Sequence, residues 1–213
     1  HKDGLVYEAF KVMPFCPRCQ TSLSNFEVGQ GYKDIPDISA YVLFELRDEG
    51  DTSSDGHTGE SFLAWTTTPW TLPGNTALAV NPELKYSLIE TVQKDIPVKV
   101  WVASDLISKL KEKNILPEAC TTLKEVKGSE LVGQSYVPPF DFYTKPGTLP
   151  SNQEAKINNA WKVYAGDFVT AEDGTGIVHI APAFGDDDYK LAVAQDLPII
   201  IHVGTDGKIK EGN

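Results

Sequence analysis

The chain contains the stretch GTGIVHIAPAFGDDDY at residues 174–189, and this stretch decides the local fold. Alternating apolar side chains predict a strand over Gly176–Ala181. The proline and the glycine of PAFG end that strand, and a helix is predicted over 186–195. The strand, turn and helix would bring His179 and Asp188 to the same end of a sheet.

The polar residues of this stretch have two interpretations. Carboxylates in the first turn of a helix complement its dipole, which is enough to explain Asp186 and Asp187. A single histidine in a strand is more often a packed core residue than a functional one. However, a carboxylate held at the end of a sheet would suit an α-ammonium group. Asp188 and His179 are therefore candidate site residues.

A second unusual stretch is AWTTTPWTLPGNT, residues 64–76. Pro69 ends a strand that carries three threonines, and alternation predicts Thr66 and Thr68 on one face and Thr67 on the other. Threonine hydroxyls can hold a water or an ester without adding a charge, although threonine also simply favours strands. Because two tryptophans bracket the threonines, we favour a site.

The remaining pattern predicts an α+β, β-rich fold: a closed β-barrel-like domain with a few flanking helices. A helix is predicted over Asp105–Asn114, capped by Ser104. Polar loops are predicted at Arg47–Glu60 and Lys145–Asn159. The other expected strands are Ala40–Leu46, Ser61–Thr67, Thr76–Val80, Tyr86–Val92, Val98–Ala103, Val163–Thr170 and Pro198–Val203.

Composition narrows the class of protein. With 213 residues, 41% of them hydrophobic, the chain can bury a core, and it has no apolar run of the ~20 residues that a membrane helix needs. A net charge of −11 is unusual for a free-standing nucleic-acid binder. Cys16 and Cys19 form half of a tetrahedral zinc site, and Cys120 is alone. We predict no metal, and a reducing, cytoplasmic setting.

Both motifs resemble the editing domain that is inserted in class I isoleucyl-tRNA synthetases. The valyl and leucyl relatives typically carry arginine at Thr68 and lysine or methionine at His179, so these two residues indicate the isoleucyl type. Residues 12–27 resemble the segment that leads into this domain in the eukaryotic cytosolic members of the family. The resemblance implies a connecting segment with the cysteine pair at residues 1–34 and the editing domain at 35–213.

In this family the implied activity is removal of valine wrongly attached to isoleucine tRNA. The two amino acids differ by one methylene group, which a hydrophobic pocket alone discriminates weakly, as is established for these synthetases. The resemblance implies that Asp188 anchors the α-amino group and that His179 rejects the longer side chain. Water would attack the ester directly, without a covalent intermediate. The implied catalytic residues are Thr68, His179 and Asp188, and the implied substrate-binding residues are Thr66, Thr67, Trp70 and Asn75.

The resemblance also implies the partners. They are the 3′ end of a mischarged tRNA, valyl-adenylate, and the rest of the same isoleucine-tRNA ligase chain. No cofactor is expected in this domain, because ATP is used by the synthetic domain, whose nucleotide-binding motifs are absent here. The balance between hydrolysis of the adenylate and of the charged tRNA stays open. The alternatives are a free-standing deacylase, which predicts a basic face, and a non-catalytic zinc-dependent structural or interaction module, which predicts four ligands.

Overall fold

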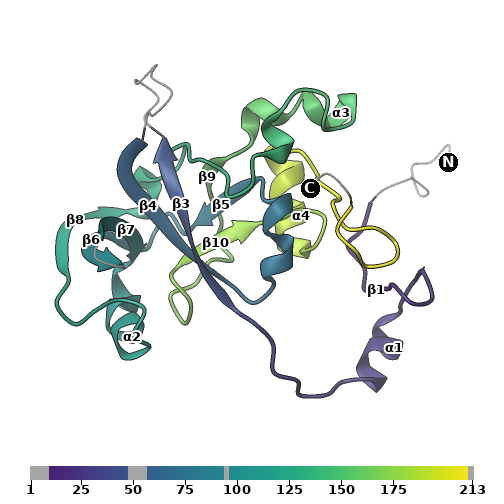
Figure 1. The fold of residues 1–213 in the computed structure, drawn as a ribbon, viewed down its shortest axis with the longest axis horizontal. Coiled ribbons are helices and arrows are strands. Elements are labelled where there is room, and N and C mark those ends of the chain that lie inside the picture. The colour runs from purple at the N-terminus through teal and green to yellow at the C-terminus, as the bar shows by residue number, and fades with distance from the viewer. Residues whose placement is uncertain (1–9, 48–56, 94–95, 211–213) are drawn as a thin grey trace.

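The computed structural model describes residues 10–47, 57–93 and 96–210, which form two larger sheets and a small hairpin (Figure 1). The hairpin pairs β1 (Phe15–Cys16) with β2 (Thr21–Ser22). It leads into α1 (Asn25–Gln30), whose N-terminus is closed by a capping box between Ser24 and Glu27. Helix α1 buries no residue and lies apart from the body of the molecule.

The larger sheet has five strands in the order β3-β4-β7-β6-β8. Its strands are β3 (Ala40–Arg47), β4 (His57–Thr66), β6 (Lys85–Gln93), β7 (Ile96–Ala103) and β8 (Thr121–Lys127). Every pair is antiparallel except β4 with β7. Apolar side chains of these strands, including Phe44, Phe62 and Trp101, form most of the main core.

The smaller sheet has three strands in the order β10-β5-β9. They are β5 (Ala77–Val80), β9 (Lys162–Ala165) and β10 (Ile177–Ile180), and β5 is buried along its whole length. Helix α4 (Asp186–Ala194) packs Leu191 and Ala192 against this sheet, in a cluster with Ala77, Ala79 and Ile180. The predicted strand, turn and helix at 174–189 are thereby confirmed.

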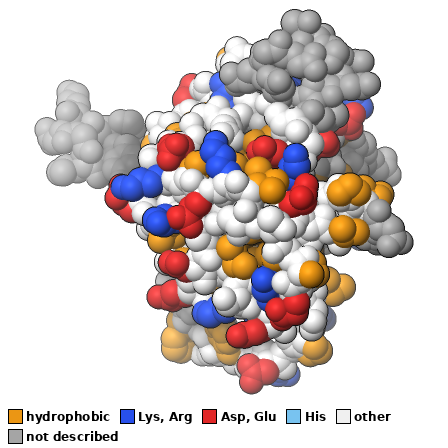
Figure 2. Space-filling view, turned by 90° about the vertical axis from the view of Figure 1, so that its left-hand side faces the viewer, with side chains coloured by type: hydrophobic (Ala, Val, Ile, Leu, Met, Phe, Trp, Pro, Cys, Tyr) orange, Lys and Arg blue, Asp and Glu red, His pale blue; other side chains and the backbone are white. Residues whose placement is uncertain are grey.

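The other helical segments are short. They are η1 (Pro69–Gly74), η2 (Ser104–Leu106), α2 (Ile107–Glu112), η3 (Gly128–Glu130), η4 (Phe142–Thr144), α3 (Ser151–Glu154) and η5 (Ile157–Asn159). Across the described part of the chain, no helix is long and apolar enough to cross a membrane. On the face drawn in Figure 2, which is the β6–β8 side of Figure 1, lysines and arginines are interspersed with aspartates and glutamates.

The α+β class is correct, but the prediction of a closed barrel is wrong. Closure would require β3 and β8, the two edges of the five-stranded sheet, to pair with each other, and they do not. Strand β8 is polar and exposed except at Val126, so its outer edge lies towards solvent. The outer edge of β3 instead meets a short segment, in which Tyr136 forms an isolated bridge with Leu46.

Several local predictions also need correction. No strand forms over Pro198–Val203, where the backbone N–H of Ile199 donates to the Gln153 side chain instead. The strand predicted over Val163–Thr170 ends at Ala165, because the chain then turns, with the Val169 N–H donating back to the carbonyl of Gly166. Ser104 does not cap a helix, since its hydroxyl bonds that of Ser87.

The two predicted polar loops are only partly loops. Of the stretch Arg47–Glu60, residues 48–56 lie outside the described residues, and 57–60 belong to β4. The stretch Lys145–Asn159 contains α3 and η5. Strand β8 was not predicted, because the sequence TTLKEVK offers little apolar alternation.

Candidate functional site

A cavity of about 500 Å³ lies between the end of β4, the strand β10 and the first turn of α4. Five of the seven predicted site residues line it: Thr66, Thr67, Thr68, His179 and Asp188. They come from two stretches, 64–76 and 174–189, that are far apart in the sequence. The structure therefore brings the two sequence motifs together in one pocket.

The three threonines follow one another around the end of β4. The strand ends at Thr66, and Pro69 starts the η1 turn directly afterwards. The hydroxyl oxygens of Thr66 and Thr68 lie 3.3 Å apart, and the Thr68 backbone N–H donates to Thr66 Oγ1 at 3.1 Å. Because the chain has left the strand, Thr67 lines the same pocket and does not turn to the opposite face.

His179 is held by hydrogen bonds at both ring nitrogens. Asn75 Nδ2 lies 2.8 Å from His179 Nδ1, and Thr71 Oγ1 lies 2.9 Å from His179 Nε2. Asn75 Nδ2 also donates to the carbonyl of Ala77, which can only accept, and this fixes the amide orientation. His179 Nδ1 must therefore accept, so the proton lies on Nε2 and is donated to Thr71 Oγ1. The Thr71 hydroxyl in turn donates a hydrogen bond to the carbonyl of Thr68.

This arrangement keeps the histidine neutral. His179 is only 7% exposed, and burial, assisted by the nearby His202, lowers its pKa to about 4. A second proton would have to sit on Nδ1, directly against an N–H of Asn75. With both nitrogens occupied, the imidazole has no free lone pair for a general base and serves as a fixed wall of the pocket.

Asp188 lies in the first turn of α4, and its carboxylate folds back towards the end of β10. Its Oδ2 accepts the backbone N–H of Ala181 at 2.8 Å. Gly185 makes this possible, because a Cβ at that position would lie 2.8 Å from the Asp188 carboxyl carbon. Burial raises the pKa of Asp188 to about 6, although the Ala181 N–H favours the ionised form.

The glycines before β10 fix the pocket to the larger sheet. Gly174 and Gly176 both have positive φ, at 75° and 74°. A Cβ on Gly176 would also lie 2.3 Å from that of Ala103 in β7, so only glycine fits there. The Tyr86 hydroxyl donates to the carbonyl of Gly176 at 2.7 Å.

The charged side chains that line the cavity are all acidic: Glu172, Asp173 and Asp188. Asp173 is neutralised by Lys113 at 2.6 Å. Among the described residues, no ion pair is formed by Asp188. The pocket therefore suits a cationic group beside Asp188 and does not suit a phosphate.

Two predicted site residues do not line the cavity. Trp70 is 48% exposed, and its ring packs edge-on against Phe184, which does line it. Asn75 is 3% exposed and contacts the site through His179. Two further residues hold the site that are not among the predicted ones: Thr71, which lies in the threonine-rich motif, and Tyr136, which lies in no motif.

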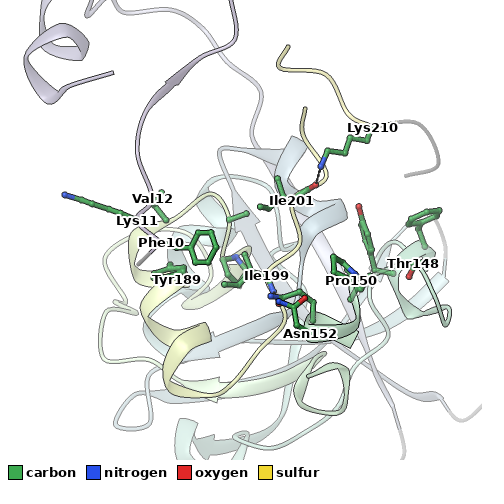
Figure 3. A pocket seen from close by; sticks show the side chains of 16 residues that line it. Phe10, Lys11, Val12, Thr148, Pro150, Asn152, Tyr189, Ile199, Ile201 and Lys210 are labelled. Atoms are coloured by element: carbon green, nitrogen blue, oxygen red, sulfur yellow. Dashed lines mark hydrogen bonds between the residues drawn. The ribbon is translucent and has the colours of Figure 1, made fainter. Parts of the chain in front are cut away.

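A second cavity, of about 640 Å³, lies on the other side of the turn between β10 and α4 (Figure 3). Pro182, Ala183 and Tyr189 line this second cavity, whereas Ala181 and Asp188 line the first. Its described lining contains no carboxylate and no histidine. It therefore lacks a counterpart of the His179 and Asp188 pair.

The cysteine pair lies in the β1–β2 hairpin. The backbone N–H of Cys19 contacts Cys16 Sγ at 3.4 Å, and this hydrogen bond is the largest influence lowering the pKa of Cys16. Within residues 10–47, 57–93 and 96–210, no three histidine, cysteine or acidic side chains are grouped to hold a metal ion.

Two solved structures have a fold similar to that of this chain. The crystal structure of GlLeuRS-CP1 is 17% identical, with a TM-score of 0.52 over 73% of this chain and 59% of that one. The crystal structure of the P. knowlesi cytosolic leucyl-tRNA synthetase editing domain is 15% identical, with a TM-score of 0.52 over 78% of this chain and 66% of that one. The chain thus has the fold of a synthetase editing domain.

The family follows from the sequence comparisons. The model of the class I tRNA synthetases (I, L, M and V) matches residues 1–192, and the chain belongs to this family. It is 41% identical over 211 residues to the isoleucine–tRNA ligases of Bacillus thuringiensis (strain Al Hakam) and of Thermoplasma volcanium. Each alignment covers 99% of this chain and 18% of the relative, so the chain spans less than a fifth of their length.

Proposed function

We propose that this chain is the editing domain of an isoleucine–tRNA ligase and hydrolyses valine that is esterified to isoleucine tRNA. The observation that carries the proposal is the meeting of Thr66–Thr68, His179 and Asp188 around one cavity. The class I family membership supports it. The 41% identity to two isoleucine–tRNA ligases supports the isoleucine assignment.

Asp188 is proposed to anchor the substrate's α-ammonium group. Its carboxylate is partly buried, accepts the backbone N–H of Ala181 and forms no ion pair within the described chain. A cation beside it would offset the desolvation that raises its pKa, so binding and ionisation support each other. An acyl group without an amine would lose this contact.

His179 is proposed to be the wall that rejects isoleucine. A pocket can exclude one additional methylene group only if the wall does not yield. The ring is fixed at both nitrogens by Asn75 and Thr71. Its face stacks on Phe44 at a centroid distance of 6.4 Å.

Hydrolysis is proposed to proceed by direct attack of water. The described lining contains no serine or cysteine that could act as a nucleophile, and both nitrogens of His179 are occupied. The hydroxyls of Thr67 and Thr68 are exposed to the cavity, where they can orient the ester and its water. Catalysis would then rest on positioning rather than on a covalent intermediate.

The substrate of this domain is proposed to be delivered by the rest of the synthetase chain. The acidic chain is proposed to receive the 3′ end of a mischarged tRNA, or valyl-adenylate, from the larger cytoplasmic synthetase, whose synthetic domain uses ATP. The mixed charges in Figure 2 and the net charge of −11 support tRNA being held elsewhere. The eukaryotic cytosolic type stays a prediction. A zinc-dependent structural or interaction module stays the alternative, and it leaves the grouping of Thr66–Thr68, His179 and Asp188 around one cavity unexplained.

The test is a mischarging assay with the full-length synthetase, isoleucine tRNA, ATP and valine. The wild-type enzyme is expected to accumulate no valyl-tRNA, and the Asp188→Asn enzyme is expected to accumulate it. Activation of isoleucine serves as the control and should be equal in both. Equal, low levels of valyl-tRNA in both enzymes would contradict the proposal.

A further inference from the structure

We propose that Tyr136 is a positioning residue that keeps the His179 wall in place, through Asn75 and through Phe44. This inference rests on the proposed editing function and adds a specificity determinant outside both motifs. Tyr136 does not line the cavity. It is 1% exposed and lies in the segment between η3 and η4.

The first route is a directed chain of hydrogen bonds. The Tyr136 hydroxyl donates to Asn75 Oδ1 at 2.5 Å. Asn75 then presents Nδ2 to His179 Nδ1 at 2.8 Å. The buried Asn75 Oδ1 needs a hydrogen-bond donor, and the Tyr136 hydroxyl supplies it. The hydroxyl therefore favours the orientation of the Asn75 amide in which Nδ2 donates and His179 Nδ1 accepts.

The second route runs through ring packing. Tyr136 packs edge-on against Phe44, with centroids 5.4 Å apart and an interplanar angle of 90°. Phe44 stacks on His179 at an interplanar angle of 20°. Tyr136 therefore supports one edge and one face of the imidazole without touching it.

The backbone around Tyr136 is well anchored, as a positioning residue requires. Its N–H donates to the carbonyl of Trp161, and Val137 N–H donates to that of Glu45 in β3. Ser135 forms an isolated bridge with Lys162 in β9. The segment thus joins an edge of each sheet, and it holds the phenol where the two sheets meet.

Removal of the hydroxyl alone isolates this effect. In Tyr136→Phe, the ring contact with Phe44 remains, but Asn75 Oδ1 loses its donor. Asn75 and His179 should then leave their present orientation for part of the time. We expect hydrolysis of isoleucyl-tRNA relative to valyl-tRNA to rise about fivefold, the effect of one lost hydrogen bond.

The test compares four full-length enzymes: wild type, Tyr136→Phe, His179→Ala and the double variant. Hydrolysis of the two charged tRNAs is measured for each. If Tyr136 acts through His179, its substitution should change the ratio by less than about twofold once His179 is alanine. A purely structural role would slow both hydrolyses alike and would add to the effect of His179→Ala.

Tyr164→Phe is the matched control, because it removes a hydroxyl that donates to the carbonyl of Asn159. This variant should leave the ratio unchanged. If Tyr136→Phe does not fold, Phe44→Leu replaces it in the comparison. The Phe44→Leu substitution weakens the ring packing between Tyr136 and His179 and keeps the hydrogen bonds. An unchanged ratio in a folded Tyr136→Phe or Phe44→Leu enzyme would overturn the proposal.

A spectroscopic arm separates this inference from the proposed function. Nitrogen NMR of histidine-labelled full-length protein, assigned by the signal missing in His179→Ala, reports which nitrogen carries the proton. The wild type should show Nε2 protonated and Nδ1 unprotonated, and Tyr136→Phe should show a second tautomer or exchange broadening. If the wild type hydrolyses neither ester, the editing function fails, whereas an unperturbed tautomer in Tyr136→Phe contradicts the role of Tyr136.

Discussion

The carboxylate of Asp188 accepts a hydrogen bond of 2.8 Å from the backbone N–H of Ala181, seven residues earlier. This contact closes the turn between β10 and α4 on itself. The contact directs the carboxylate of Asp188 towards the cavity. An aspartate in the first turn of a helix that faced solvent would only complement the helix dipole. The contact depends on Gly185, the N-cap residue of α4.

Gly185→Ala should therefore displace the Asp188 carboxylate. The new Cβ would lie 2.8 to 3.0 Å from its carboxyl atoms, closer than real contacts allow. We expect editing of valyl-tRNA by the full-length enzyme to fall at least about tenfold, as a misplaced binding group predicts. Gly29→Ala is the control, because nothing lies within 4 Å of a Cβ there. Normal editing by Gly185→Ala would argue against this geometry.

Asp188→Asn should stabilise the fold at neutral pH. The pKa of Asp188 rises from 3.8 unfolded to about 6 folded, so the folded chain holds the proton more tightly. This group therefore costs stability as the pH rises through that window, on the order of 3 kcal/mol above it. Urea unfolding should show Asp188→Asn to be more stable at pH 7, with the difference vanishing below about pH 4. A variant less stable than wild type at pH 7 would contradict this account.

His179 has the opposite pH dependence. Its pKa falls from 6.5 to about 4 on folding, so its contribution to stability is present above pH 6.5 and is lost as the pH falls towards 4. In the wild type, Asp188 offsets this loss. The Asp188→Asn chain should therefore lose stability more steeply than the wild type between pH 6.5 and 4. Parallel pH profiles for the two chains would contradict the raised pKa of Asp188. An Asp188→Asn chain that keeps its full stability between pH 6.5 and 4 would contradict a neutral, buried His179.

His179→Ala should open the pocket to isoleucine. Without the imidazole, hydrolysis of isoleucyl-tRNA should rise at least about tenfold, whereas hydrolysis of valyl-tRNA should fall much less. Melting temperature is the control, because a histidine that only packs the core would lower stability and both hydrolyses together. If isoleucyl-tRNA stays protected in a well-folded variant, His179 is not the wall.

Local rules explain which parts of the site could be predicted from the sequence. Pro69 ends β4, and the PAFG turn ends β10, so Thr68, His179 and Asp188 could be placed at element ends from sequence alone. Tyr136 could not, because its contact with Asn75 spans 61 residues and no motif surrounds it.

The barrel prediction failed for a related reason. Counting strands does not show whether the two edges of a sheet pair, since edge pairing depends on contacts between distant segments. Strand β8 has too few apolar side chains to be predicted, and its exposed edge leaves the sheet open. Pro198–Val203 has the composition of a strand, but Ile200 packs with Tyr143 and Leu149 instead.

The separated chain should bind tRNA weakly. Its net charge of −11 repels a polyanion, and phosphate contacts normally dominate affinity. A salt titration of tRNA binding compares the 213-residue chain with the full-length protein, and only the latter should bind at physiological salt. Tight, salt-dependent binding by the chain alone would show a basic surface that the account does not contain.

The most direct test of the account is single-turnover hydrolysis of preformed valyl-tRNA and isoleucyl-tRNA, both on isoleucine tRNA, by the full-length wild-type enzyme. The account predicts that valyl-tRNA is hydrolysed at least about a hundredfold faster, because only the shorter side chain fits beside His179. The same preference should disappear in the Asp188→Asn enzyme, as both esters become stable. Equal rates for the two esters in the wild type, or unchanged hydrolysis in Asp188→Asn, would contradict it.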